Sequence, residues 1–262
     1  MNTLGSIVAF TLLGGVVSVL LASLFLLVPE NGRRRAMPLL IAFATGALLA
    51  AALLGLLPEA MELAGPEGYG GVGIALLVGI ALFFILEKLV LWRHCHEDHC
   101  ETHVPHEDHR QRSPATLVIV GDTVHNMLDG VLIAAAFLID SHLGVMTGIA
   151  VLAHEVPSEV GNFAVLLHGG LSRLQAFGWN LFSGLGAVAG GIVGYYALSA
   201  IRPLLPYALG VSAASLLYVA VADLIPGLHR RVDPVSSTLQ VLLIAVGVGV
   251  VAGVEYLVPH HH

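Results

Sequence analysis

Two hydrophobic stretches of this 262-residue chain carry ionisable side chains. They are GDTVHNMLDGVLIAAAFLI (121–139) and TGIAVLAHEVPSEVGNFAVLLH (147–168), and neither contains lysine or arginine. Their ionisable residues in mid-stretch are Asp122, His125, Asp129, His154, Glu155 and Glu159. A charged side chain at the centre of a membrane helix costs about 2.5 kcal/mol or more, so four ionised carboxylates would cost on the order of 10 kcal/mol. A bound cation, protons or a dense hydrogen-bond network must offset that cost.

The first stretch places its polar residues on one side of a helix. His125 and Asp129 are four residues apart and share a face, and Asp122 lies one turn earlier on nearly the same side. Asn126 lies about 100° round from His125. One helix therefore offers imidazole nitrogen and carboxylate oxygen toward a neighbour.

The second stretch offers a matching set. His154 and Ser158 form an i,i+4 pair, and Glu155 and Glu159 form a second stripe beside it. Facing the first helix, these residues would complete a mixed nitrogen and oxygen site of the kind that zinc and similar first-row ions take. Calcium and magnesium would prefer oxygen alone. Two alternatives stay open: a hydrogen-bonded polar seam between the helices, and a proton relay without metal.

Composition places the chain in a membrane. It is 56% hydrophobic and 11% charged, with a mean hydropathy of +0.87, whereas soluble domains carry about 25% charged residues. The start, MNTLGSIVAF, lacks the basic segment of a signal peptide, so we interpret it as part of a retained first helix. We expect one transmembrane domain over residues 1–262, in contact with the lipid bilayer and with no nucleic-acid partner.

Hydrophobic runs predict an all-α membrane protein with eight transmembrane helices. The runs fall at about 4–28, 38–62, 71–92, 115–138, 144–168, 174–199, 207–228 and 236–258. Ten of the 11 Lys and Arg residues lie at one set of loops, and only Arg202 lies at the other. The positive-inside rule therefore places the first set in the cytoplasm and both termini outside.

Two similar short segments suggest an internal repeat. LLPEA (56–60) and LIPGL (224–228) occupy the second and seventh runs. Runs one to three and six to eight could then form an inverted repeat around runs four and five, a 3+2+3 arrangement common in transporters. Run six has glycines at 186, 190 and 194, and run eight has them at 249 and 253. These small faces favour packing within the chain over a homodimer interface, which remains the alternative.

A polar loop joins the third and fourth runs. Residues 93–110 read RHCHEDHCETHVPHEDHR, and the candidate ligands are Cys95 and Cys100 with His94, His96, His99 and His103. The spacing fits no closed zinc finger. We interpret the loop, 93–113, as a cytoplasmic segment that captures or senses metal, with a solvated linker as the alternative.

These motifs resemble the Zrt/Irt-like (ZIP) family of divalent-metal transporters. HNMLDG (125–130) and HEVPSEVGNFAVLL (154–167) resemble the family's fourth and fifth helices most specifically. The branch most similar to it carries His-Glu-x-Pro-His-Glu in the fifth helix, of which this chain keeps His-Glu-x-Pro-x-Glu. Three further segments resemble the family's second, third and seventh helices. They are LLPEAMELA (56–64), FFILEKLVLWRH (83–94) and LLYVAVADLIPGL (216–228), in that order. The similarity therefore covers essentially the whole chain.

The resemblance implies a binuclear metal site between the fourth and fifth helices. His125, Asp129 and His154 would belong to the main transport site, and Asn126 and Glu155 to the adjoining one, with Asp129 able to bridge them. The chain departs from the branch at Ser158, where a second histidine is expected, and at Asn162, where aspartate is usual. Either water or Glu159 would then fill the place of the missing imidazole.

We therefore expect a carrier that moves zinc, or a related ion such as cadmium, iron, manganese or cobalt, into the cytoplasm by alternating access. The resemblance favours an elevator-like movement of helices one, four, five and six. No organic cofactor and no enzymatic activity are expected. We expect it in a bacterial inner membrane, with both termini extracytoplasmic. Two alternatives are a cation-diffusion-type exporter, which shares His125-x-x-x-Asp129, and an intramembrane metalloenzyme, which would need His-Glu-x-x-His.

Overall fold

The described part of the computed structural model, residues 2–95, 112–229 and 234–257, contains helices and no strands. The first run forms one continuous rod of three segments, whereas the second and third runs are two helical stretches that turn at Gly65 and lie on opposite sides of that turn. The bounds in the first rod are α1 Thr3–Leu12, η1 Leu13–Val17 and α2 Ser18–Phe25; in the second and third runs they are α3 Glu30–Ala50, η2 Ala51–Leu56 and α4 Leu57–Cys95.

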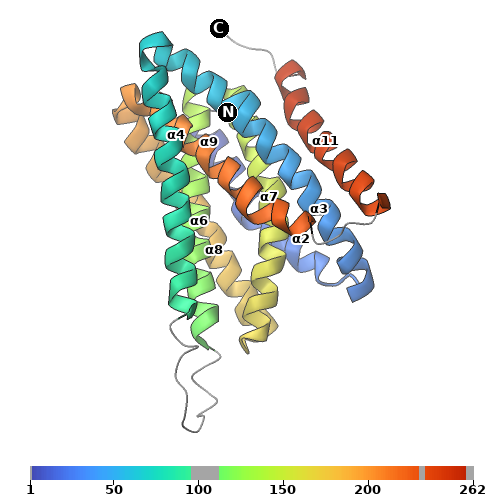
Figure 1. Cartoon of the computed structure of the whole chain (residues 1–262). Coiled ribbons are helices and arrows are strands. Elements are labelled where there is room, and N and C mark those ends of the chain that lie inside the picture. The colour runs from blue at the N-terminus through green and yellow to red at the C-terminus, as the bar shows by residue number, and fades with distance from the viewer. Residues whose placement is uncertain (1, 96–111, 230–233, 258–262) are drawn as a thin grey trace.

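Three long helices follow and form the centre of the bundle (Figure 1). They are α6 Arg112–Ile139, α7 Ser141–His168 and α8 Arg173–Ala200. The remaining elements are η3 Arg202–Leu204, α9 Leu205–Tyr218, η4 Val219–Leu224, α10 Ile225–Leu228 and α11 Pro234–Leu257. Helix α6 packs most extensively on α8, α4 on α9, and α3 on α11.

By length and composition, six stretches of the described helices could cross a membrane, against eight predicted. Two features account for the difference. The stretch Glu30–Leu86 has 57 residues, far more than the roughly 20 of one crossing, and its backbone leaves helical geometry at Gly65 (φ 65°, ψ 174°). Helix α7, with 28 residues, is not one of the six; it carries His154, Glu155 and Glu159.

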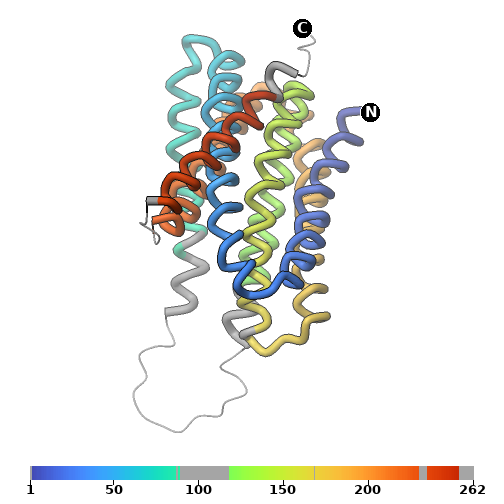
Figure 2. Tube along the Cα trace, turned by 90° about the vertical axis from the view of Figure 1, so that its right-hand side faces the viewer, coloured from blue at the N-terminus to red at the C-terminus, as the bar shows by residue number. Residues whose placement is uncertain are grey.

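The bundle has two distinct ends. The start of α1 and the end of α11 lie at one end in both views, and the α2–α3 and α7–α8 turns lie at the other (Figures 1 and 2). Arg33, Arg34 and Arg35 follow the first of these turns, and Arg173 follows the second. We call this the arginine end.

Glycine contacts hold α6, α8 and the first rod close together. A Cβ atom on Gly15 of η1 would overlap the backbone of Gly184 in α8, and one on Gly190 would overlap the backbone of Met127 in α6. Packing within the chain, expected for the sixth run, is thus what the structure shows. At Gly249 and Gly253 of α11 an added Cβ would meet nothing among the described residues.

Candidate metal centre

The two polar helices form a hairpin with a one-residue hinge. Asp140 lies between α6 and α7, and its side-chain oxygen accepts a hydrogen bond from the backbone N–H of His142 at 2.6 Å. A carboxylate at a helix N-terminus satisfies a free donor and offsets the positive end of the helix dipole. Because the connection is so short, residues separated from Asp140 by the same number of positions in the sequence lie at the same level along the hairpin axis, as His125 and Glu155 do.

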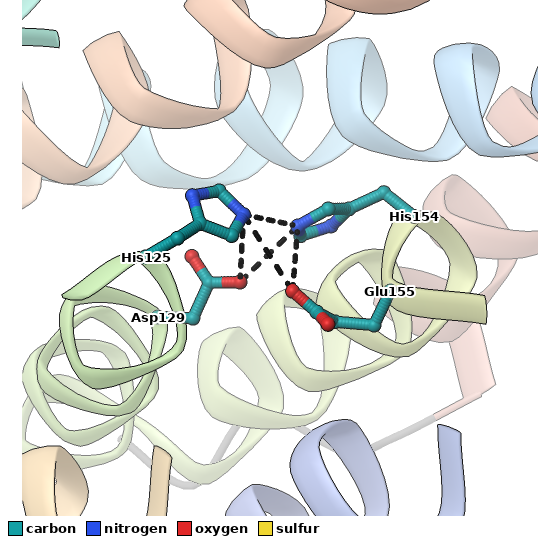
Figure 3. Close-up of side chains that lie close together, drawn as sticks. All are labelled: His125, Asp129, His154 and Glu155. Carbon is teal, nitrogen blue, oxygen red and sulfur yellow. Dashed lines mark hydrogen bonds and ion pairs between the residues drawn. The ribbon is translucent and has the colours of Figure 1, made fainter. Parts of the chain in front are cut away.

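Four side chains from this hairpin converge on one point (Figure 3). His125 and Asp129 come from α6, and His154 and Glu155 come from α7; one ligand atom from each lies within 4.8 Å of all the others. His154 Nε2 is 3.1 Å from Asp129 Oδ2 and 3.5 Å from Glu155 Oε1. His125 Nε2 is 3.8 Å from Asp129 Oδ2, 3.5 Å from Glu155 Oε1 and 3.3 Å from His154 Nε2. We call these four residues the histidine cluster.

These spacings fit a tetrahedral ion. Zinc binds imidazole nitrogen and carboxylate oxygen at about 2.0–2.2 Å, which separates neighbouring ligand atoms of a tetrahedron by about 3.3–3.5 Å. Five of the six separations are 3.1–3.8 Å and bracket that value, and the sixth, between the Asp129 and Glu155 oxygens, is at most 4.8 Å. The cluster therefore has the size and the donor atoms of a zinc site.

The cluster is buried and leaves its carboxylates without hydrogen bonds. Asp129, His154 and Glu155 are at most 2% exposed, and no described residue hydrogen-bonds to any carboxylate oxygen of Asp129 or Glu155. His154 Nδ1 lies 3.2 Å from the carbonyl oxygen of Ala150. When Nδ1 carries the proton and donates to that carbonyl, the lone pair of Nε2 points into the cluster, as metal-binding histidines require.

A second polar layer lies one helical turn nearer the arginine end. Asp122 accepts a hydrogen bond at Oδ1 from Asn162 Nδ2 at 2.8 Å, and its backbone carbonyl accepts one from Asn126 Nδ2 at 3.2 Å. Glu159 is fully buried, and Asp122 is its main charged neighbour. We call Asp122, Asn126, Glu159 and Asn162 the amide layer.

Of the eight residues predicted to bind metal, the structure brings four together in the histidine cluster. Asp122, Asn126 and Glu159 lie buried beside it in the amide layer. Ser158 is half-buried and lies outside both groups. Glu159 is not one of the four residues whose ligand atoms converge, so it does not take the place of the expected second histidine in this structure. Most of the His-rich loop, 96–111, lies outside the described residues.

Sequence reasoning missed the contribution of α8. Ser183, 1% exposed, is a close neighbour of Asp122, and Asn180 on the same helix is 2% exposed. Both are polar side chains in a helix that is otherwise largely apolar, and they are three residues apart. That spacing on one face was the signal that could have identified them.

Comparisons with known proteins agree on one family. The family model described as "ZIP Zinc transporter" matches residues 92–255, more than half of the chain. "Zinc transporter zipt-7.1" of Caenorhabditis briggsae is 29% identical, over 94% of this chain and 78% of the relative. "Zinc transporter ZIP13" of Pongo abelii is 31% identical over 80% and 64%, and "Zinc transporter YKE4" of Saccharomyces cerevisiae is 29% identical over 82% and 69%. The chain thus spans about two thirds to three quarters of the length of these relatives.

Proposed function

Because the chain belongs to the ZIP zinc transporter family, an integral membrane family of transporters and not of enzymes, we propose that it moves zinc or a similar divalent ion into the cytoplasm. The observation that carries the proposal is the histidine cluster. Its four ligand atoms are spaced as around one tetrahedral ion, and they lie inside the hairpin where no basic side chain offsets the carboxylates.

The donor set argues for zinc as the preferred cargo. Two imidazoles and two carboxylates suit zinc, and they also suit iron, cobalt, manganese or cadmium to different degrees. Because the ion is cargo, it must leave as well as bind. A partly exposed ligand helps release, and His125, whose side chain is 25% exposed, is the most accessible member of the cluster.

For topology we propose eight crossings with both termini outside. Support comes from dividing Glu30–Leu86 at Gly65 and from counting α7, which together add two crossings to the six. The start of α1 and the end of α11 share one end of the bundle (Figure 2). The opposite end carries the arginines expected on the cytoplasmic side.

The 3+2+3 repeat is also part of the proposal. The π-helical segments η2 (51–56) and η4 (219–224) stand at matching places, each two residues before a proline, Pro58 and Pro226. A proline has no N–H to continue the helical bonding, so the preceding turn widens at both places for the same reason. In this repeat α3 corresponds to α9, and α4 corresponds to α11. Exchanging the two halves would therefore turn the α3–α11 contact into the α9–α4 contact, and both contacts are extensive.

For the mechanism we propose alternating access in which α1, α6, α7 and α8 move together against the other helices. The close backbone contacts of η1 and α6 with α8 support one rigid unit. The His-rich loop would capture or sense metal on the cytoplasmic side, and a homodimer is compatible with the open face of α11. The relatives named above are animal and yeast proteins, so a bacterial inner membrane stays a prediction that fractionation of the source cells would test.

Uptake of zinc into proteoliposomes loaded with a fluorescent indicator tests the function. Asp129→Ala removes one ligand and should abolish uptake while leaving the protein in the membrane. Glu67→Ala is the matched control, because Glu67 is an exposed carboxylate outside both polar groups. Uptake that survives in Asp129→Ala would remove the proposed site.

Direction and topology need a second measurement. In a background of Cys95→Ser and Cys100→Ser, single cysteines at Asn2 and Arg35 should react with an impermeant reagent from opposite sides. Vesicles sorted by that reaction should then show zinc moving toward the Arg35 side. Net movement the other way would favour the exporter, and cleavage of a peptide or lipid by the purified protein would favour the metalloenzyme.

A further inference from the structure

A pocket at the arginine end lies away from both polar groups. Its volume is about 400 Å³, and it lies between α2, α3, α7 and α8. Most of its wall is apolar, including Leu26, Leu167 and Phe177, but two arginines, Arg33 and Arg173, also line it. Arg33 lies just after the α2–α3 turn and Arg173 lies just after the α7–α8 turn. The two positive charges therefore come from different parts of the chain.

The pocket has positive charge and no internal counter-charge. No acidic residue lines it, and within the described residues neither arginine forms an ion pair. The start of α8 adds to the positive potential. Ser172 and Gln175 cap that helix, yet the N–H groups of Arg173 and Leu174 have no acceptor within the helix. An anion placed there would meet two guanidinium groups and a helix N-terminus.

The surroundings of the pocket are those of a surface that faces acyl chains. Leu27, on its rim, is 74% exposed, and Leu174, beside Arg173, is 80% exposed. Ala164 of α7 lines the pocket and is also exposed. An anion that carries a hydrocarbon chain can therefore use the arginines and the apolar wall together, which inorganic phosphate cannot do.

We propose that this pocket binds an anionic phospholipid of the membrane leaflet at the arginine end. The phosphate lies between Arg33 and Arg173, and the start of an acyl chain lies along Leu26, Leu167 and Phe177. Basic pockets between transmembrane helices are established sites for anionic headgroups, and guanidinium matches phosphate with two parallel hydrogen bonds. Such a lipid would connect α3 with the α7–α8 turn.

The molecule provides an internal comparison. A larger pocket of about 660 Å³ lies between α6 and α8, lined by Ile119, Val120 and Trp179, with Gln175 and Thr123 as polar members and no charged residue. Its walls are equally suited to hydrocarbon. It should not distinguish anionic from neutral lipid, because it offers no cation to a phosphate diester headgroup.

Native mass spectrometry of the full-length protein in detergent tests the proposal, with phosphatidylglycerol and phosphatidylcholine as probes. The wild type should bind phosphatidylglycerol several-fold more tightly. Arg33→Gln with Arg173→Gln should weaken that binding by about tenfold or more, at roughly a factor of several for each arginine. Arg34→Gln with Lys88→Gln removes the same charge from the same end outside the pocket and should change binding by less than about twofold.

Two further measurements separate the possible causes. Ala164→Trp fills the apolar part and keeps both arginines, so it should weaken phosphatidylglycerol binding while retaining any binding of inorganic phosphate. Zinc titration and a monodisperse elution profile show that each variant is folded. Equal binding of the two lipids, an equal loss in the control pair, or displacement of the lipid by millimolar inorganic phosphate would each overturn the proposal. The test requires no transport, so it stands apart from the proposed function.

Discussion

One helical turn separates the histidine cluster from the amide layer, and the two differ in how they treat buried carboxylates. In the cluster, Asp129 and Glu155 have no hydrogen-bond partner among the described residues, and their oxygens converge with two imidazole nitrogens. In the amide layer, Asn162 donates a hydrogen bond to Asp122 at 2.8 Å, while Glu159, like the two cluster carboxylates, has no hydrogen-bond partner among the described residues.

This difference indicates where metal preference resides. A buried carboxylate without a partner is costly until a cation or a proton arrives. Both groups hold such carboxylates, but only in the histidine cluster do two of them converge with imidazole nitrogens, so the cluster gains most from an ion. Nitrogen donors there favour zinc over hard ions. The amide layer offers only oxygen ligands, and one oxygen of Asp122 already accepts a hydrogen bond from Asn162. The layer therefore suits brief contact with a passing ion. The following predictions test that contrast.

The largest effect should follow loss of both imidazoles. His125→Gln with His154→Gln converts the histidine cluster into an oxygen site. Calorimetric titration should show zinc affinity lower by more than about 100-fold, beyond the 10- to 100-fold typical of losing a supporting group. Manganese, which accepts oxygen ligands, should lose less. Equal losses for both metals would contradict the contrast between the two groups.

Removing the charges of the amide layer should affect movement more than binding. Asp122→Asn with Glu159→Gln keeps the shape of both side chains, so zinc affinity should stay within about threefold of the wild type. Uptake into liposomes should slow by up to about tenfold, because conduction through a buried path uses several weak sites in sequence. Loss of high-affinity binding would show that the two groups act as one site, and unchanged uptake would place the layer outside the path.

Asn162→Asp restores the residue usual in the resembled branch and should destabilise this protein. The carboxylate cannot donate to Asp122, and the two like charges would face each other in a buried place. We expect a loss of about 1–3 kcal/mol in stability, seen as a lower midpoint in a thermal melt in detergent. The exchanged pair, Asp122→Asn with Asn162→Asp, should recover most of that loss, because the amide donor is then on α6 and the accepting carboxylate is on α7. No recovery would mean that the 2.8 Å contact is not what stabilises the site.

The smallest effect should come from Ser158→His. A histidine one turn beyond His154 would lie on the same face of α7 and could reach a shared ion. Zinc binding should tighten by a few-fold while the maximal uptake rate falls, because an ion held more firmly is released more slowly. Paired titration and flux would measure both. An unchanged zinc affinity would show that position 158 does not face the histidine cluster.

Much of the histidine cluster could be predicted from the sequence, because its parts are local. The spacing of His125 and Asp129 fixes their common face, and the short connection at Asp140 fixes the height of His154 and Glu155 against them. Which carboxylate would enter the cluster was harder. Glu155 does and Glu159 does not, since the outcome depends on how far α7 is rotated about its axis.

The surroundings of Asp122 could not be predicted in the same way. Ser183 approaches it only because α8 packs closely on α6, and that packing depends on backbone contacts at Gly186 and Gly190. Asn162 was noted as a departure from a motif, but its bond to Asp122 requires the register between two helices. The all-helical fold was predicted correctly. The π-helical segments before Pro58 and Pro226 were not, because a proline predicts a disturbance and not its form.

The one-residue hinge at Asp140 also sets the order in which the protein can be assembled during synthesis. All four ligands of the histidine cluster belong to a single hairpin, so they can meet as soon as α7 has emerged and before α8 exists. Contacts this close in the sequence form early and without long loops to close. The surroundings of Asp122 are complete only after Ser183 has been made. A nascent chain could therefore hold an ion before its bundle is finished, and the bound ion would oppose separation of the two helices while the remaining ones are inserted.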